Sequence, residues 1–337
     1  MTDFAPRPVV SMCCLTYNQA ATIAQCLDSM LMQVVDVPVE IVVHDDASTD
    51  GTAEIVADYA DRHPTLIRTI LQTTNQYGGA STHPVVLLLE AARGDYVALC
   101  EGDDYWTDTR KISIQFDALN AHGQIDICGH DARVLRINEA SRSVEERIQG
   151  YPGGIYTPQQ VAMKEDVKIA TASLFFRRSV VTTFSEFMRS RHRDIGDLYL
   201  KILGARRGGL LYLPKAMAAY RQNNPGSWSR NISDNGESRL AAAKSKIEGL
   251  SDLQRHVGGA FVITAASVKL RTLYWVLQDS TLRPYVRACF LLQQARHLIS
   301  YAVLRAAARR LTGHPGRDRH HGPILPNAAG GEGEAAG

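Results

Sequence analysis

The amino-acid sequence predicts an α/β protein in which a mostly parallel sheet is flanked by helices, with a helical appendage at the C-terminus. Two observations carry this prediction. Strand and helix patterns alternate through the first hundred residues, an order that is typical of parallel sheets with crossover helices. The strand segments are also continuous apolar runs, as expected for strands that are buried on both faces.

The elements of this first half follow one another at short intervals. Residues 9–18 (VVSMCCLTYN), 39–46, 66–73 and 95–102 are predicted to be strands. The segments between them are predicted to be helices after short turns: residues 22–33, 46–63 and 83–94. The first helix places Ile23, Leu27, Met30 and Leu31 on one face, which gives it an apolar side to bury.

The second half of the sequence is less regular. A helix is expected at 111–122, a strand at 125–135, a loop or hairpin at 138–156, and a strand at 169–178. A helix at 194–209 closes in Gly, two short strands follow at 210–214 and 216–223, and long basic helices begin near residue 236. The Gly-, His- and Pro-rich end from residue 313 is expected to be disordered. The predicted domains are therefore 1–232, a helical region 233–312 and a tail 313–337.

Composition excludes several classes of protein. The 337 residues are 45% apolar, which supports a sizeable core, and 37 Lys and Arg nearly balance 35 Asp and Glu, so no nucleic-acid partner is expected. The six cysteines form no C-x-x-C pair and five lie in or beside apolar runs, which suits reduced thiols in the cytoplasm. No signal peptide and no transmembrane run are recognisable.

Polar residues gather at the ends of three predicted strands. Thr16, Tyr17 and Asn18 end the first strand, Asp45 and Asp46 the second, and the run EGDD at 101–104 the fourth. Carboxyl ends of neighbouring parallel strands meet at one edge of the sheet, where ligands bind. Because crowded carboxylates repel one another, the acidic run favours a divalent metal site over a solvated turn. No G-x-G-x-x-G, G-K-[ST] or G-x-S-x-G motif competes with this interpretation.

Three segments in this order resemble the family-two inverting glycosyltransferases of the GT-A fold. They are VSMCCLTYNQ at 10–19, VHDDASTDGT at 43–52 and EGDDYWTD at 101–108, and the resemblance extends over residues 8 to about 228. It implies transfer of a hexosyl-type sugar from a nucleotide-diphosphate-sugar donor, with UDP favoured, to a saccharide or lipid-linked acceptor, in cell-surface polysaccharide biosynthesis. A sugar nucleotidyltransferase and a degenerate nucleotide-binding scaffold remain alternatives.

The resemblance assigns donor-binding roles to individual residues. Thr16, Tyr17 and Asn18 would line the nucleotide pocket, although an ordinary strand-to-helix turn also explains them. Asp46 would accept a hydrogen bond from the base, as an acceptor-only group can from an imide N–H, while Asp45 would be structural. Ser48, Asp50 and Thr52 are expected to cap the following helix. Asp104 would bind Mg²⁺ or Mn²⁺, and Asp103 would contact the ribose or assist the metal.

The resemblance also implies a catalytic base and a closing loop. Asp197, in the run DIGDLYL, would remove the acceptor's proton, although an N-cap role explains it as well; Asp194 would be a solvated neighbour of nearby arginines. Arg221 would contact phosphate or acceptor, or lie on the surface, and the GSWS run at 226–229 would belong to the same loop. Trp106 would stack on acceptor sugar or pack in the core. Glu101 stands where the family commonly has Asp, which leaves its role open.

The C-terminal helices carry a separate signal. Residues 283–310 combine an apolar stripe with arginines at 287, 296, 305, 309 and 310. A basic amphipathic helix of this kind predicts either association with an anionic membrane surface or docking on a protein surface. The expected location is therefore the cytoplasm, with peripheral attachment at the inner face of the membrane as one possibility.

Overall fold

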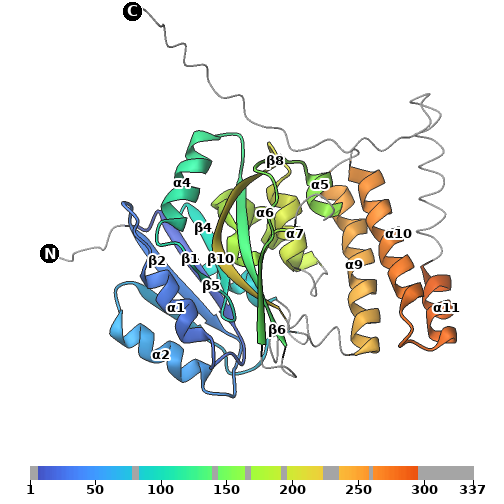
Figure 1. Cartoon of the computed structure of the whole chain (residues 1–337), viewed down its shortest axis with the longest axis horizontal. Helices are drawn as coiled ribbons and strands as arrows, with labels where there is room; N and C mark the ends of the chain where they lie inside the picture. The colour runs from blue at the N-terminus through green and yellow to red at the C-terminus, as the bar shows by residue number, and fades with distance from the viewer. Residues whose placement is uncertain are drawn as a thin grey trace, which may run out of the picture.

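The computed structural model describes residues 7–77, 83–138, 143–163, 168–190, 196–222, 235–257 and 261–294. Figure 1 shows a twisted sheet at the centre of the molecule, with a group of helices from the C-terminal part of the chain beside it. Asp194, the GSWS run, the continuation of the basic helix beyond residue 294 and the tail after residue 313 lie outside the described residues.

The predicted alternation of strands and helices is confirmed in the first half of the chain. The elements are β1 (Val10–Thr16), α1 (Ile23–Leu31), β2 (Val39–Asp45), α2 (Thr52–Arg62), β3 (Ile67–Leu71), α3 (Pro84–Ala91) and β4 (Tyr96–Glu101). Their strands pair in parallel in the order β3-β2-β1-β4. Crossover connections through the intervening helices join these parallel strands, as the order of the elements requires.

The second half makes the sheet mixed. It contains β5 (Tyr105–Trp106), α4 (Lys111–Ala121), β6 (Ile127–Asn138), β7 (Ser143–Ile148), β8 (Gly154–Tyr156), α5 (Pro158–Met163), η1 (Thr171–Ser173), β9 (Phe175–Arg177), α6 (Arg178–Ser190), α7 (Gly196–Gly204) and β10 (Leu210–Gln222). The order continues β4-β9-β6-β10-β5, with β9 and β5 antiparallel to their neighbours. The predicted hairpin is confirmed, because β7 pairs with β6 in antiparallel register.

Two expectations for this half are wrong. The strand predicted at 169–178 is a 3₁₀ turn followed by the three-residue β9, and the helix α6 begins directly after it. The two short strands predicted at 210–223 form one strand, β10, whose register against β6 shifts between Leu213 and Ala218. Pro214 lies inside this irregular stretch, where the lack of an N–H disrupts no regular pairing.

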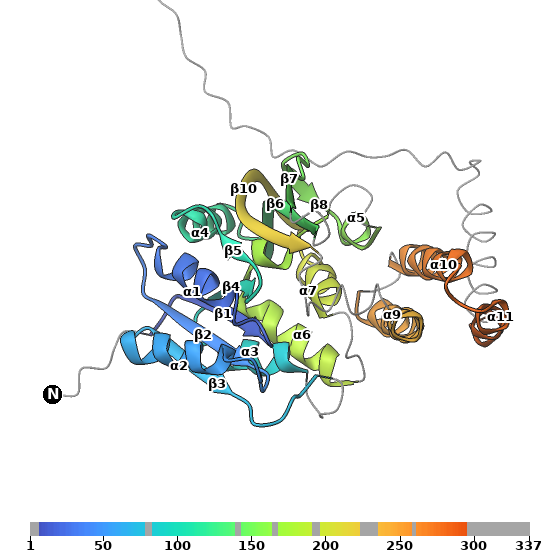
Figure 2. The ribbon, with the colours of Figure 1, turned by 60° about the horizontal axis from the view of Figure 1, so that its bottom comes forward.

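Helices cover both faces of the sheet, and the two cores divide along alternate residues of each strand. Cys13 of β1 packs in a core with α3, α5, α6 and α7, whereas the next residue, Cys14, packs in a core with α1, α2 and α4. Figure 2 shows α1 and α2 on one side of the sheet and α6 and α7 on the other. Five of the six cysteines are buried thiols, as predicted, and Cys289 is exposed.

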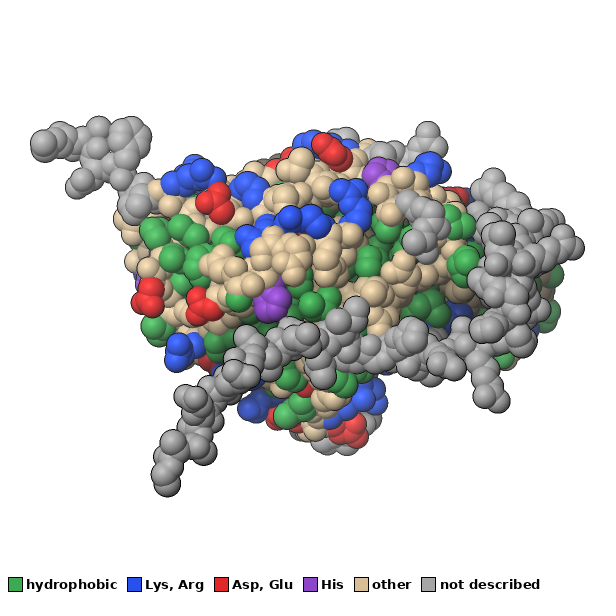
Figure 3. Space-filling view, turned by 90° about the horizontal axis from the view of Figure 1, so that it is seen from above, with side chains coloured by type: hydrophobic (Ala, Val, Ile, Leu, Met, Phe, Trp, Pro, Cys, Tyr) green, Lys and Arg blue, Asp and Glu red, His purple; other side chains and the backbone are tan. Residues whose placement is uncertain are grey.

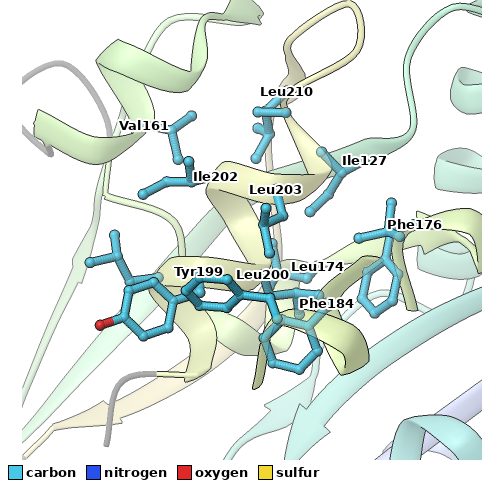
Figure 4. Close-up of a cluster of buried hydrophobic side chains, with 14 of the residues drawn as sticks. Ile127, Val161, Leu174, Phe176, Phe184, Tyr199, Leu200, Ile202, Leu203 and Leu210 are labelled. Atoms are coloured by element: carbon cyan, nitrogen blue, oxygen red, sulfur yellow. The ribbon is translucent and has the colours of Figure 1, made fainter. Parts of the chain in front are cut away.

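Helix α7 is almost entirely buried, because every residue from Leu198 to Gly204 lies in the interior. Its apolar residues meet side chains from β6, β9, α5, α6 and β10 (Figure 4). The C-terminal helices α9 (Gly236–Val257) and α10 (Val262–Gln278) join the same core through Leu250, Leu253, Phe261 and Val268. A Cβ at Gly249 would lie 1.9 Å from the Tyr199 hydroxyl oxygen, so α9 approaches α7 at a point where only glycine fits.

Two observations concern the surface. The face shown in Figure 3 mixes basic, acidic and hydrophobic side chains, so no single sign of charge covers it. Among the described residues, no helix combines the length and the apolar character that crossing a bilayer requires.

Candidate active site

The C-terminal ends of β1, β2 and β4 lie side by side, as the sequence predicted. Thr16 at the end of β1 is paired with Asp45 of β2, and Leu15 with Glu101 of β4. Gly102 follows β4 at the point of closest approach, because a Cβ there would lie 2.4 Å from the Gln19 side-chain oxygen and 2.7 Å from Thr16 Oγ1. Glycine at 102 therefore lets the acidic turn press against the loop after β1.

Three carboxylates converge after β4. Glu101, Asp103 and Asp104 each place an oxygen within 4.8 Å of the others, which is a spacing at which one metal ion can be shared. Asp104 is completely buried, and its Oδ1 accepts a hydrogen bond of 2.8 Å from the backbone N–H of Arg221. Its Oδ2 is buried without a hydrogen-bond partner. A buried carboxylate oxygen with no hydrogen-bond donor is suited to binding a cation.

Burial and mutual repulsion make the ionised forms of the clustered carboxylates unfavourable. Burial, then the charges of Asp103 and Asp197, raise the pKa of Glu101 to about 8. Burial, reinforced by Asp103 and Glu101, raises the pKa of Asp104 well above its usual range. Both shifts have the sign expected when like charges are confined together away from water. A divalent ion would remove this penalty by pairing with the ionised forms.

Arg221 is anchored beside the cluster by four contacts. Its backbone N–H binds Asp104, and its guanidinium donates to the carbonyl oxygen of Asp103 and to the side-chain oxygen of Gln25. The guanidinium also lies over the Tyr105 ring, 4.8 Å from its centroid. These contacts fix Arg221 beside the acidic cluster, so it is more than the unattached surface residue that the sequence left as an alternative.

The DDASTDGT segment joins the loop after β2 to the loop after β1. Three side-chain oxygens accept hydrogen bonds from consecutive backbone N–H groups: Ser48 from Asn18 at 2.8 Å, Thr52 from Gln19 at 2.8 Å and Asp50 from Ala20 at 3.0 Å. The expectation that Ser48, Asp50 and Thr52 cap the following helix is wrong, because the N-cap of α2 is Gly51 and no side chain caps it, although Asp50 accepts the Thr52 N–H at 3.1 Å. The main partner of this segment is nevertheless the first loop. The motif therefore sets the shape of residues 16–20.

The two neighbouring aspartates of β2 and its loop have different surroundings. Asp45 accepts hydrogen bonds from the N–H and hydroxyl of Ser48, as the structural interpretation expected. Asp46 is buried, and its two oxygens accept the backbone N–H groups of Gln76 at 2.8 Å and Tyr77 at 3.0 Å. Each carboxylate oxygen has capacity for a second hydrogen bond. Asp46 thus orders the loop after β3 and retains accepting capacity.

Residues 16–18 present different groups. Thr16 is buried and its hydroxyl donates to the Gln19 side chain at 2.8 Å. Asn18 has a left-handed backbone, with φ of 51°, and its side chain accepts the Thr49 N–H at 2.8 Å. Tyr17, by contrast, is 43% exposed. Of this segment, Tyr17 offers the largest accessible surface to a ligand.

Asp197 lies in the first turn of α7, near the carboxyl end of β4. Its carboxylate is close enough to Glu101 to help raise the pKa of that residue. Burial, followed by the charges of Glu101, Asp104 and Asp197, also raises the pKa of Tyr220 in β10. Asp197 Oδ2 pairs with the Lys201 ammonium at 2.7 Å. The fold thus brings Asp197 to the acidic turn across about a hundred residues of sequence.

Trp106 corrects one expectation. The side chain is 1% exposed, and its indole N–H donates to the carbonyl oxygen of Ala172 at 2.9 Å. The buried ammonium of Lys111 lies 4.2 Å from the centre of the ring. Trp106 therefore packs in the core, as the alternative interpretation stated, and presents no face to an acceptor sugar.

Sequence reasoning missed several participants in this site. Lys201 could have been found, because it lies four residues after Asp197 on a predicted helix, where an acid and a base meet. Tyr220 precedes Arg221 in a segment that was predicted as a strand, and no role in the site was predicted for its side chain. Gln25 and Arg221 are hydrogen-bonded although they lie 196 residues apart along the chain, and no local pattern in the sequence indicates such a pairing.

Comparisons with known proteins agree with the geometry. The family model described as glycosyl transferase family 2 matches residues 11–184. An uncharacterised protein of Mycobacterium tuberculosis is 34% identical over 255 residues, covering 72% of this chain and 68% of that protein. The succinoglycan biosynthesis protein ExoO of Rhizobium meliloti is 26% identical over 328 residues, covering 90% and 88%.

Comparison with solved structures supports the fold. The Staphylococcus aureus TarS fragment 1–349 in complex with UDP-GlcNAc aligns with a TM-score of 0.52, at 17% identity, over 89% of this chain and 91% of that one. At this identity the likeness shows a shared fold, the GT-A arrangement expected from the sequence. Because the family model spans more than half of the chain, the chain belongs to glycosyl transferase family 2.

Proposed function

We propose that the protein is a metal-dependent, inverting glycosyltransferase that moves a sugar from a nucleotide-diphosphate donor to an acceptor hydroxyl. The observation that carries this proposal is the convergence of Asp104, with its unpartnered buried oxygen, and Asp197 at one edge of the sheet. One acidic group would serve the leaving diphosphate and the other the attacking hydroxyl. The setting proposed is cell-surface polysaccharide assembly, which the name of the rhizobial relative supports.

In the proposed reaction the acceptor oxygen attacks the anomeric carbon on the face opposite the leaving group. A bond forms between this oxygen and the anomeric carbon, and the bond from that carbon to the diphosphate oxygen breaks. The electron pair of the broken bond leaves with the nucleoside diphosphate, and the hydroxyl proton passes to the carboxylate of Asp197. One displacement of this kind inverts the anomeric configuration.

The residues present fit a divalent metal. Mg²⁺ and Mn²⁺ prefer oxygen ligands and are commonly held by one or two carboxylates together with substrate phosphates. Asp104 would be the direct ligand through Oδ2, with Asp103 and Glu101 beside it. When bound, the ion supplies Lewis-acid stabilisation of the diphosphate. Arg221, fixed by Gln25 and the Asp103 carbonyl, adds a positive charge next to the same turn.

The donor pocket would lie between the loops after β1 and β2. Tyr17 provides an exposed aromatic surface, and Asp46 retains accepting capacity at the end of β2. A carboxylate that accepts from an imide N–H suits uracil, so a UDP-sugar is the favoured donor. The acceptor would be a saccharide or a lipid-linked saccharide.

A panel of nucleotide sugars tests the proposal. With Mn²⁺ present, the matching nucleoside diphosphate sugar should raise the melting temperature, because a ligand at 100 times its Kd stabilises the native state by about 2.7 kcal/mol. The same ligand without metal should produce no shift. Uridine compounds should exceed guanosine and thymidine ones. Product analysis should then show an inverted anomeric centre.

The outcome also separates the two rival functions. A nucleotidyltransferase would consume a nucleoside triphosphate and release pyrophosphate, which membership in the glycosyltransferase family disfavours. A degenerate scaffold would show the thermal shift with no transfer to any acceptor and no donor hydrolysis. A retained anomeric configuration, or shifts that are equal with and without metal, would contradict the mechanism proposed above.

We also propose that the C-terminal helices contact an anionic membrane surface. Between residues 262 and 294 the sequence has one acidic residue, Asp279, and its carboxylate is buried against Arg239 at 2.7 Å. Helices α10 and α11 (Pro284–Gln293) expose large apolar side chains: Tyr274, Trp275, Leu277, Tyr285 and Leu292. Aromatic and aliphatic groups flanked by arginines, with no exposed acid among them, suit a membrane interface.

Vesicle binding tests this second proposal. The full-length protein should co-sediment with phosphatidylglycerol vesicles at low salt and lose this association in about 1 M salt, where the Debye length falls to about 3 Å. Deletion of residues 283–337 should weaken binding while leaving the nucleotide site intact. Equal binding to neutral phosphatidylcholine vesicles, or none at low salt, would assign the helices to protein packing, which Phe290 already provides on the inner side of α11.

A further inference from the structure

Lys201 is a buried lysine in the middle of α7. Its residue exposure is 4%, whereas lysine is rarely buried so deeply unless its charge is paired. Its neighbours on the helix, Leu200 and Ile202, belong to the apolar core (Figure 4). The aliphatic stem therefore runs through the core, and a specific interaction must stabilise the ammonium group at its end.

Two oxygen atoms hold that ammonium group. Nζ donates to Asp197 Oδ2 at 2.7 Å and to the carbonyl oxygen of Ile169 at 3.0 Å. The carbonyl belongs to the segment before η1, outside α7, so the nitrogen is fixed from two elements. The side chain of Asp197 is 38% exposed, in contrast to 5% for that of Lys201. The cation is thus the rigid member of the pair and the carboxylate the solvent-facing one.

The surroundings of Asp197 explain why such an anchor is needed. Glu101 faces it from β4, Tyr220 faces it from β10, and Lys201 lies on its own helix. Two carboxylates in one partly desolvated space repel each other, and an unrestrained aspartate at a helix start would turn toward water. Because the Lys201 ammonium is buried, its pair with Asp197 offsets the cost of removing that charge from water. The same pair fixes the direction of the Asp197 carboxylate.

We propose that Lys201 is a positioning residue that holds the Asp197 carboxylate in the orientation required to take the acceptor's proton. The inference rests on the proposed function, in which Asp197 is the base. Lys201 touches neither donor nor acceptor and acts through Asp197 alone. A misplaced catalytic group costs up to about 100-fold in rate, so this anchoring affects turnover and leaves donor binding unchanged.

The test compares Lys201→Met with Lys269→Met. Lys269 is also a buried helical lysine, in α10, where it contacts Gln254 at 3.4 Å, so it controls for loss of a buried charge. Lys201→Met should lower kcat about 10- to 100-fold with an unchanged calorimetric Kd for the nucleoside diphosphate and Mn²⁺. Lys269→Met should retain the wild-type kcat. If Lys201→Met does not fold, Lys201→Gln supplies the same comparison with a smaller change in polarity.

A double-mutant cycle separates positioning from a structural role. In the Asp197→Asn background, Lys201→Met should cause no further loss, because its effect passes through the missing carboxylate. Losses that multiply in the double variant would overturn the proposal, and so would a Lys201→Met enzyme with normal kcat. Wild-type turnover in Asp197→Asn alone would instead refute the base assignment. The two failures are therefore distinguishable.

Discussion

Asp104→Asn should abolish metal-dependent donor binding and lower kcat/KM by more than about 100-fold. Mutation of a residue that only supports a metal ligand typically lowers metal affinity or activity about 10- to 100-fold. Asp104 is expected to be a ligand itself, so its loss should cost more. The amide retains the oxygen that accepts the Arg221 N–H, so the local backbone should persist. It cannot neutralise a cation, and Oδ2 of the wild type is the buried oxygen without a donor. Calorimetry with UDP and Mn²⁺, and turnover with and without EDTA, measure the effect.

A stability measurement distinguishes loss of the ligand from loss of the fold. In metal-free protein the raised pKa of Asp104 means that the folded state disfavours its ionised form, and this penalty grows as the pH rises above the pKa of the unfolded chain. Asp104→Asn should therefore melt at the same temperature as the metal-free wild type at pH 8, or higher. A variant that still binds UDP more tightly with Mn²⁺ than without it would contradict the assignment.

Asp197→Asn should lower kcat by about 10² to 10⁴, the usual loss on removal of a general base. Asparagine has nearly the same shape, so α7 should keep its position under the acidic turn. The calorimetric Kd for nucleoside diphosphate and metal should be unchanged, because the base contacts the acceptor hydroxyl. The expected signature is a loss in kcat at constant donor affinity, measured by single-turnover transfer and by calorimetry.

Asp194→Asn is the matched control for this prediction. The two aspartates are three residues apart and undergo the same change, but Asp194 is expected to be a solvated neighbour of arginines, a role worth little. Its kcat should stay within about twofold of the wild type, which is our estimate for a surface charge. An inactive Asp194→Asn enzyme alongside an active Asp197→Asn enzyme would reverse the assignment of the base.

The first half of the fold was predictable because its signals are local. Strands β1, β2 and β4 are continuous apolar runs, and each helix between them has its own apolar face. Helix α6 was missed because Val180, Val181, Thr182 and Thr183 are β-branched and favour strands by propensity. The burial of Val180 and Val181 with Phe184 and Phe187 in the core overrides that preference. Strand β10 was divided in two because Pro214 resembles a terminator, whereas the register shift accommodates it.

In the candidate site, too, the features with local sequence signals were predictable and those that depend on long-range contacts were not. The acidic turn and the DDASTDGT segment were found because strand ends meet at one edge of a parallel sheet. Their hydrogen-bond partners were not, because no sequence pattern indicates that Ser48 binds Asn18 or that Gln76 and Tyr77 bind Asp46. Trp106 had two interpretations in the sequence, and only the packing around Ala172 and Lys111 decides between them.

The close approach of α9 to α7 at Gly249 has a consequence for how this chain can vary. Position 249 lies beyond residues 11–184, which the family model matches. Yet its missing side chain sets the depth at which Tyr199 sits, and Tyr199 is two residues from Asp197 on one rigid helix. A larger residue at position 249 would therefore displace Tyr199 on the helix that carries Asp197. The identity of one residue in α9 thus bears on the position of Asp197, although α9 contributes none of the site residues described above.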